Sequence, residues 1–154
     1  MQFANLVTPK AIRLFGTIKS KKRLFQEIAE TAEAAWGIDA AQAVDALKER
    51  ESLGSTGVGQ GVALPHARID GIEQVRGVFV RLEKTLDYGS VDRAPVDLVF
   101  ALFAPRDAGV EHLKALALVS RTLRDSGLRS KLRANTDNDK LFAILTAHPD
   151  VKAA

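Results

Sequence analysis

Two histidines and one arginine, in and around a glycine-rich segment, are the residues of this chain best suited to chemistry. The segment "GSTGVGQGVALPHAR", residues 54–68, places four glycines within eight residues and then His66 directly after a proline. Arg50 stands just before the segment, and His112 follows later in the chain. Neutral imidazole is a good nucleophile towards phosphorus near pH 7, and a guanidinium group offers a fork of donors that fits phosphate. These residue types indicate phosphoryl chemistry at a histidine.

Each of these features also has a structural interpretation. His66 could be a structural histidine, Arg50 a surface charge at a helix end, and His112 a helix cap. Near a helix start the macrodipole disfavours a protonated ring, so His112 could instead be a second neutral histidine that donates a hydrogen bond to phosphoryl oxygens or to the first ring. Spacing alone favours the helix cap. The four glycines could form a cradle of backbone amides for an anion, or only a flexible connection. His148, near the end of the chain, is expected at the surface.

Several other kinds of site are not expected. The segment lacks the lysine of a nucleotide-binding P-loop, and Val62 stands where a dinucleotide-binding loop needs its last glycine. The three histidines are scattered and lack metal-ligand spacing. We therefore expect neither a cofactor nor a metal.

Length and composition are those of a soluble globular protein. The 154 residues are 46% apolar and 27% charged, with a net charge of +3 and no cysteine. Disulfides and thiolate metal sites are therefore excluded, and a reducing cytoplasm is the expected location. The longest apolar run, residues 98–105, is far too short to span a membrane, and no secretory signal is visible. We expect one domain, residues 1–154, with no membrane insertion.

A basic cluster at residues 19–23, "KSKKR", allows two interpretations. It could be a patch for nucleic acid, or it could be the solvated start of a helix. Single-strand binding favours aromatic side chains among the charges, and the cluster has none. We therefore expect a helix start and no nucleic-acid partner.

Apolar spacing and capping residues predict four helices. We expect them at 20–36, capped by Ser20 and ended by Gly37; at 39–50, with a capping box from Asp39 to Gln42; at 110–124, ended by Gly127; and from Thr136 onward, with Asp139 completing a box. The third helix should bury Leu113, Leu116, Ala117 and Leu123.

Three apolar segments predict strands, at residues 61–65, 77–82 and 98–104. The last is apolar on both faces, so it should lie in the sheet centre with both sides covered. Helices and strands alternate along the chain in a way that indicates an α/β fold, a single mixed β-sheet flanked by helices on both faces.

Three segments together resemble a known family. In order they are "GSTGVGQGVALPHAR", "VDLVFALFAP" and "EHLKALALVSRTLRD". They resemble the EIIA type-2 domain, the fructose/mannitol type, of the bacterial phosphoenolpyruvate-dependent phosphotransferase system (PTS). The opening "LVTPKAIRLFGTIKSKKRLFQEIAE" and the STG form of the loop look more like its nitrogen-regulatory branch, the PtsN or EIIA-Ntr type. The resemblance runs over residues 6–145.

The resemblance implies a role for each candidate residue. His66 matches the histidine that accepts a phosphoryl group from a phosphohistidine on an HPr-like or NPr-like carrier, as tele-phosphohistidine on Nε2. His112 matches the second histidine of the pocket, and Arg50 matches the arginine placed before the glycine loop. One departure is visible, because Ala67 stands where a glycine commonly follows the histidine.

The same resemblance implies a cytoplasmic phosphocarrier rather than a turnover enzyme. Its output would be binding to regulated proteins, such as kinases or potassium transport components. Two alternatives stay open from the sequence: a sugar-specific EIIA that passes phosphate to a fructose- or mannitol-type transporter domain, and a binding module that never carries phosphate.

Overall fold

A six-stranded mixed sheet forms the middle layer of the protein, whose computed structural model describes residues 1–147. The strands are β1 (Ile12–Phe15), β2 (Gly57–Gly59), β3 (Val62–Ala63), β4 (His66–Ile69), β5 (Arg76–Leu86) and β6 (Val96–Pro105). β5 and β6 form an antiparallel pair at the centre. β1 runs parallel to β5, while β3 and then β4 run parallel to β6 on its other side. β2 closes the β3 edge as an antiparallel strand.

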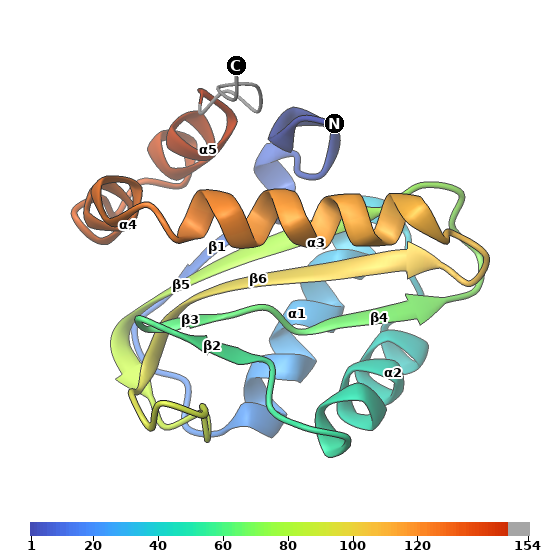
Figure 1. Cartoon of the computed structure of the whole chain (residues 1–154), viewed down its shortest axis with the longest axis horizontal. Coiled ribbons are helices and arrows are strands. Elements are labelled where there is room, and N and C mark those ends of the chain that lie inside the picture. The colour runs from blue at the N-terminus through green and yellow to red at the C-terminus, as the bar shows by residue number, and fades with distance from the viewer. Residues whose placement is uncertain (148–154) are drawn as a thin grey trace.

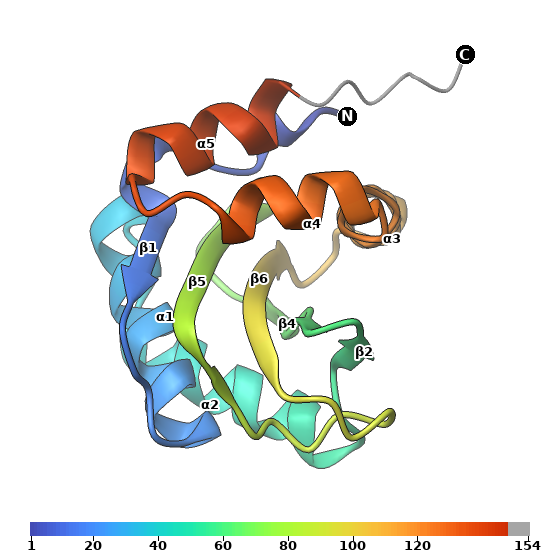
Figure 2. The same cartoon turned by 90° about the vertical axis from the view of Figure 1, so that its left-hand side faces the viewer.

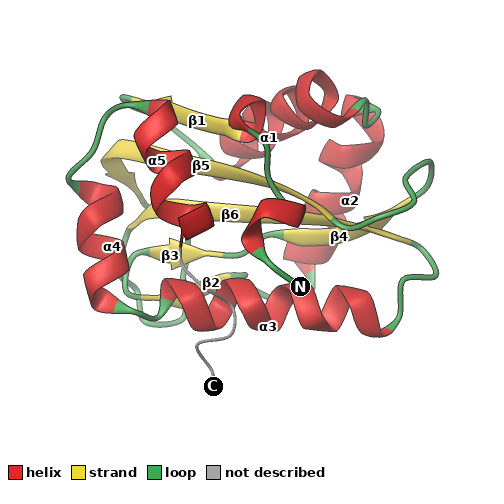
Figure 3. Cartoon of the chain, turned by 90° about the horizontal axis from the view of Figure 1, so that it is seen from above, coloured by secondary structure: helices red, strands yellow, loops and turns green. Residues whose placement is uncertain are grey.

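Helices cover both faces of this sheet (Figures 1 and 2). α1 (Lys21–Trp36) and α2 (Ala40–Ser52) lie on one face, and α3 (Val110–Leu123), α4 (Ser126–Arg133) and α5 (Asn138–Ala147) lie on the other. Two short 3₁₀ turns, Phe3–Asn5 and Pro9–Ala11, precede β1. Phe3 of the first packs on the α5 side of the sheet (Figure 3), and Ala11 of the second packs with α1 and α2. This arrangement confirms the predicted fold class. No helix within residues 1–147 has the length and apolar character needed to cross a membrane.

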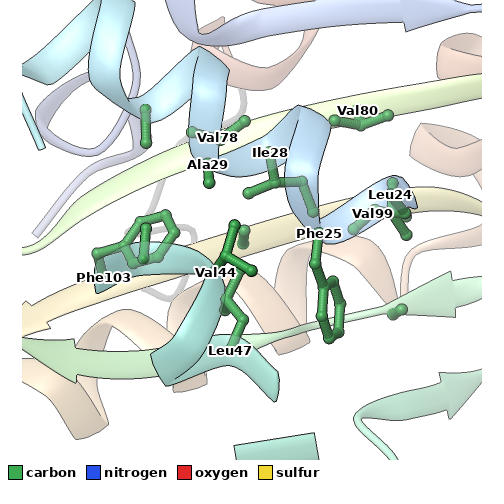
Figure 4. Close-up of a cluster of buried hydrophobic side chains, with 14 of the residues drawn as sticks. Leu24, Phe25, Ile28, Ala29, Val44, Leu47, Val78, Val80, Val99 and Phe103 are labelled. Carbon is green, nitrogen blue, oxygen red and sulfur yellow. The ribbon is translucent and has the colours of Figure 1, made fainter. Parts of the chain in front are cut away.

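Successive side chains of the central strand β6 point to opposite faces of the sheet, and this divides the core into two layers. On β6, Val99, Ala101 and Phe103 pack in the cluster formed with α1 and α2 (Figure 4). The residues between them, Phe100 and Leu102, pack in the cluster formed with α3, α4 and α5. All these side chains have 0% exposure. The prediction of a central strand covered on both sides is therefore confirmed, and it explains why this strand is apolar without interruption.

The first helix begins and ends where the sequence predicts. The Ser20 hydroxyl accepts a hydrogen bond from the Arg23 amide, and Gly37 ends α1 in the left-handed conformation, at a φ of 73°. The basic cluster is therefore the cap and first turn of a helix, preceded by Lys19. At the other end, the Trp36 indole donates to the Gly77 carbonyl at 3.0 Å, and the Arg76 guanidinium lies 4.4 Å from the centre of its ring.

The third helix has the predicted bounds to within one residue, but Gly127 is not what ends it. α3 ends at Leu123, and Gly127 lies in the first turn of α4, a helix that sequence reasoning missed. The carboxylate of Asp125 accepts hydrogen bonds from the Gly127 and Leu128 amides, so it caps this new helix. An aspartate in this position is a helix-start signal, and it outweighs the glycine two residues later.

Two predicted capping boxes also differ from the structure. Asp39 does cap α2 by accepting from the Gln42 amide, but the Gln42 side chain accepts a hydrogen bond from the Asp70 amide, at 2.7 Å, instead of closing a box. The last helix begins at Asn138 rather than after Thr136. There Asp137 accepts from the Asp139 amide, so the cap lies one residue later than predicted.

Three strands were not predicted, namely β1, β2 and β4. Each is only three or four residues long, and β2 consists of two glycines and a valine. Such short edge strands carry no alternating apolar pattern long enough to identify. As a result, His66 is the first residue of β4 rather than a loop residue, and its partner on β6 is Leu102.

Candidate functional site

The three residues singled out in the sequence lie around one surface cavity. His66 comes from β4, His112 from α3 and Arg50 from the last turn of α2, and all three line a cavity of about 500 Å³. In Figure 1 the strand β4 lies between α3 above and α2 below, which places the cavity at this edge of the sheet. The other lining residues are Ala46, Glu49, Leu53, Ala67, Arg68, Arg106, Leu113 and Leu116.

A hydrogen bond to the backbone fixes the tautomer of His66. Its Nδ1 lies 2.8 Å from the carbonyl oxygen of Leu64. A carbonyl oxygen can only accept, so Nδ1 carries the proton and Nε2 of the neutral ring keeps its lone pair. Burial lowers the pKa of His66; the bond to Leu64 opposes this effect, while the nearby positive charge of Arg50 adds to it. The ring is therefore neutral near pH 7, with a nucleophilic nitrogen at Nε2.

His112 supplies a second neutral imidazole beside the first. The two ring centres lie 5.7 Å apart, with their planes at 69°. His112 is 6% exposed, and its Nε2 is buried without a hydrogen-bond partner among residues 1–147. Burial, together with the proximity of His66 and Arg68, lowers the pKa of His112 to about 4. A buried polar atom without a partner is costly and calls for a functional explanation.

Three arginines line the same cavity as the two rings, and sequence reasoning identified one of them. Arg50 is half-buried, and its Nη1 donates to the Gly54 carbonyl at 2.9 Å. Arg68 donates to the Arg106 carbonyl at 3.0 Å, and Arg106 forms an ion pair with Asp70 at 2.6 Å. Arg68 was missed, although it stands two residues after a candidate histidine and so shares its face of β4. The cavity is suited to an anion.

The glycine-rich segment does not form an anion cradle at this cavity. None of its four glycines lines the cavity; they support the chain reversal that leads through β2 to β3. Gly61 adopts a φ of 78°, which an L side chain rarely adopts. A Cβ atom on Gly57 would lie 2.0 Å from the Ser90 hydroxyl. The structural interpretation of these glycines is therefore the better one.

The buried face of α3 differs from the predicted one. Of the residues expected inside, Leu123 is buried, Leu116 is half-buried, Ala117 is exposed, and Leu113 is 63% exposed beside the cavity. The helix is rotated so that His112 takes a buried position instead. On the opposite side of the cavity Leu53 is 81% exposed. Two leucines thus flank the histidines at the surface.

The low pKa of His112 should make the stability of the protein fall in acid. The unfolded chain protonates this ring near the ordinary value of 6.5, whereas the folded protein keeps it neutral down to about 4. The contribution of neutral His112 to the free energy of unfolding is therefore complete above pH 6.5 and is lost as the pH falls towards 4. Between pH 7 and pH 4 we expect the free energy of unfolding to decrease by about 3 kcal/mol more in the wild type than in His112→Gln.

Denaturant unfolding of both proteins at several pH values measures this difference. An NMR titration of the His112 ring gives the pKa itself. A midpoint at or above the ordinary value, or equal pH dependence of the two proteins, would contradict the expectation.

Comparison with known proteins connects this site to a family. The sequence matches the family described as "Phosphoenolpyruvate-dependent sugar phosphotransferase system, EIIA 2" over residues 5–148. A protein from Bradyrhizobium diazoefficiens with the name "Nitrogen regulatory protein" is 42% identical over 99% of this chain and 100% of its own length. A protein of the same name from Escherichia coli is 35% identical over 95% of this chain and 90% of its own length.

A solved structure shows the same arrangement of helices and strands. The crystal structure of nitrogen regulatory protein IIA-Ntr from Neisseria meningitidis superposes with a TM-score of 0.86 at 35% identity. The alignment covers 94% of this chain and 99% of that one. The chain therefore belongs to the EIIA 2 family of the phosphoenolpyruvate-dependent phosphotransferase system, as its motifs predicted, and is similar to the nitrogen regulatory proteins of that family.

Proposed function

We propose that the protein is a regulatory phosphocarrier that accepts a phosphoryl group on Nε2 of His66 from a phosphohistidine of an HPr-like carrier protein. The observation that supports this most directly is the hydrogen bond from His66 Nδ1 to the Leu64 carbonyl. It leaves the other ring nitrogen unprotonated at the wall of a cavity lined by arginines. Membership of the EIIA 2 family supports the same chemistry.

The transfer step exchanges one phosphorus–nitrogen bond for another. The Nε2 lone pair of His66 attacks the phosphorus of the donor phosphohistidine, and a new bond forms between them. The bond to the donor nitrogen breaks, and its electron pair returns to the donor ring. The His66 ring gains positive charge during the step, which the Nδ1 proton shares with the Leu64 carbonyl. No metal or additional reactant is needed to balance it.

Arg50 and His112 would balance the charge of the phosphoryl oxygens. Arg50 uses one nitrogen to hold the Gly54 carbonyl, and its fork geometry leaves further N–H groups for an anion. The Nε2–H tautomer of His112 would donate to a phosphoryl oxygen from a position that has no partner in the unphosphorylated protein, as far as residues 1–147 show. Preorganised donors of this kind stabilise charge as it develops.

The surface around the cavity would receive the partner proteins. The exposed Leu53 and Leu113 flank the histidines and would contact an apolar patch on the carrier. Phosphorylation adds nearly two negative charges in the middle of this surface, so a partner that fits one form would be repelled by the other. In this way the protein would regulate targets such as kinases or potassium transport components. A regulatory role is in keeping with the name "Nitrogen regulatory protein" of its relatives.

Reconstitution of the phosphoryl chain tests this function. The purified protein is incubated with phosphoenolpyruvate, the first enzyme of the system and an HPr-like carrier, and intact mass spectrometry is used to count phosphoryl groups. We expect one group, which phosphorus NMR assigns to Nε2, and none when the carrier is omitted. No gain in mass in the complete mixture would refute the proposal. Onward transfer to a fructose- or mannitol-type transporter domain would favour a sugar-specific role instead.

A further inference from the structure

A buried polar network lies behind the cavity and has no part in the chemistry described above. Its centre is the carboxylate of Glu51, the residue next to Arg50, with a side chain that is 8% exposed. This carboxylate accepts from the Thr56 amide at 3.1 Å and from the Thr56 hydroxyl at 2.5 Å. The Tyr88 hydroxyl lies 2.7 Å from the Thr56 hydroxyl and donates to the carboxylate at 3.3 Å. Thr56 is 4% exposed and Tyr88 is 1% exposed.

A charge from a different helix completes the network. Lys21, in the first turn of α1, forms an ion pair with Glu51 at 2.8 Å and lies 4.3 Å from the centre of the Tyr88 ring. Burial alone would raise the pKa of Glu51, but hydrogen bonds from Lys21 and Thr56 outweigh it and hold the pKa below its usual value. Glu51 is therefore a carboxylate at neutral pH, and both of its oxygens have partners.

The network continues through the backbone to the nucleophile. The Leu64 amide donates to the Thr56 carbonyl at 2.9 Å, and the Leu64 carbonyl accepts from Nδ1 of His66 at 2.8 Å. An unbroken series of hydrogen bonds thus links the Glu51 carboxylate to the imidazole, by way of Thr56 and Leu64. Because Thr56 is held by its amide and its hydroxyl at once, its carbonyl has little freedom to move.

From this connection we infer that Glu51 and Thr56 are positioning residues, which hold the Leu64 carbonyl in place and so fix the tautomer and the ring orientation of His66. The inference rests on the proposed function for its effect on phosphoryl transfer. The tautomer itself exists without phosphate and can be observed on the unmodified protein. Partners that orient a reactive histidine in this way commonly contribute about tenfold or more to its activity.

Thr56 allows a matched pair of substitutions. Thr56→Val keeps the shape and the backbone but removes the hydroxyl, while Thr56→Ser keeps the hydroxyl and should behave as the wild type. Glu51→Gln removes the charge at the centre, and Glu33→Gln makes the same chemical change at an exposed position on α1. Thermal unfolding of each variant shows whether it is folded under the assay conditions. If Glu51→Gln does not fold, Tyr88→Phe can replace it, because it removes a hydroxyl that contacts both Thr56 and Glu51.

Two measurements on each protein test the inference. Long-range ¹H–¹⁵N NMR of the unphosphorylated protein reports which nitrogen of His66 carries the proton, and phosphoramidate, used as a small chemical donor, gives the rate of phosphorylation without carrier docking. In the wild type, Thr56→Ser and Glu33→Gln we expect the Nδ1–H tautomer alone. In Thr56→Val and Glu51→Gln we expect the Nε2–H tautomer to appear, with phosphorylation on the order of tenfold slower.

The outcomes separate this inference from the proposed function. Folded Thr56→Val and Glu51→Gln proteins with the tautomer and rate of the wild type would overturn the positioning role. A wild type that takes no phosphoryl group, from phosphoramidate or from the carrier, would overturn the proposed function. In that case an altered tautomer in the two variants would still support the positioning of His66.

Discussion

Replacement of His66 by alanine is expected to abolish phosphoryl acceptance completely. The step needs a nitrogen lone pair at the cavity wall, and the bond between His66 Nδ1 and the Leu64 carbonyl provides one. His112, the other ring at the cavity, is 6% exposed, so its access to a donor protein is poor. Intact mass after incubation with phosphoenolpyruvate, the first enzyme and the carrier measures the result directly.

His148→Ala is a matched control for this substitution. It removes a histidine that the sequence places near the end of the chain and that lies outside the described residues. The sequence predicts no role for it, so we expect it to gain one phosphoryl group, as the wild type does. If His66→Ala still gained a phosphoryl group under these conditions, the acceptor would be another residue and the assignment would be wrong.

Removal of the Arg50 guanidinium is expected to slow phosphorylation on the order of a hundredfold. Loss of one preorganised donor from a site that stabilises developing charge commonly costs ~10²–10³ in rate. Arg50 is half-buried beside the two rings, where solvent screens its charge only in part. Arg50→Ala also frees the Gly54 carbonyl, which lies at an exposed position and can bind water instead. The rate with phosphoramidate and the lifetime of the phosphohistidine measure the effect.

A second arginine variant isolates this effect from the general loss of positive charge. Arg124→Ala removes an exposed guanidinium at the end of α3, away from the lining of the cavity. We expect this variant to react at the wild-type rate. An unchanged rate and an unchanged lifetime in Arg50→Ala would exclude a role for Arg50 in balancing the phosphoryl charge.

The sequence was sufficient to predict the elements that have strong local signals. Ser20 and Gly37 marked both ends of α1, because a cap hydroxyl and a left-handed glycine act within one turn. The apolar run of β6 predicted a strand covered on both faces, as the two core clusters confirm. His66, His112 and Arg50 were predicted as one site by family motifs, and the structure places all three around one cavity.

What could not be predicted depends on contacts between distant segments. α3 packs against the sheet with His112 buried and Leu113 exposed. This orientation depends on the strand order of the sheet, which the sequence alone does not reveal. Arg106 reaches the cavity only because the loop after β6 lies beside the end of β4, where Arg106 pairs with Asp70. Glu51 gave no local signal, because its partners are five, thirty and thirty-seven positions away in the chain.

The position of Trp36, the last residue of α1, makes the tryptophan fluorescence of this protein sensitive to movement of that helix. It is the only tryptophan in the sequence, and its indole donates to the Gly77 carbonyl under the Arg76 side chain. Its emission therefore responds to separation of the carboxyl end of α1 from β5. Lys21, which pairs with Glu51, stands at the opposite end of the same helix. A shift in emission would thus reveal displacement of the carboxyl end of α1, and an unshifted spectrum would exclude it.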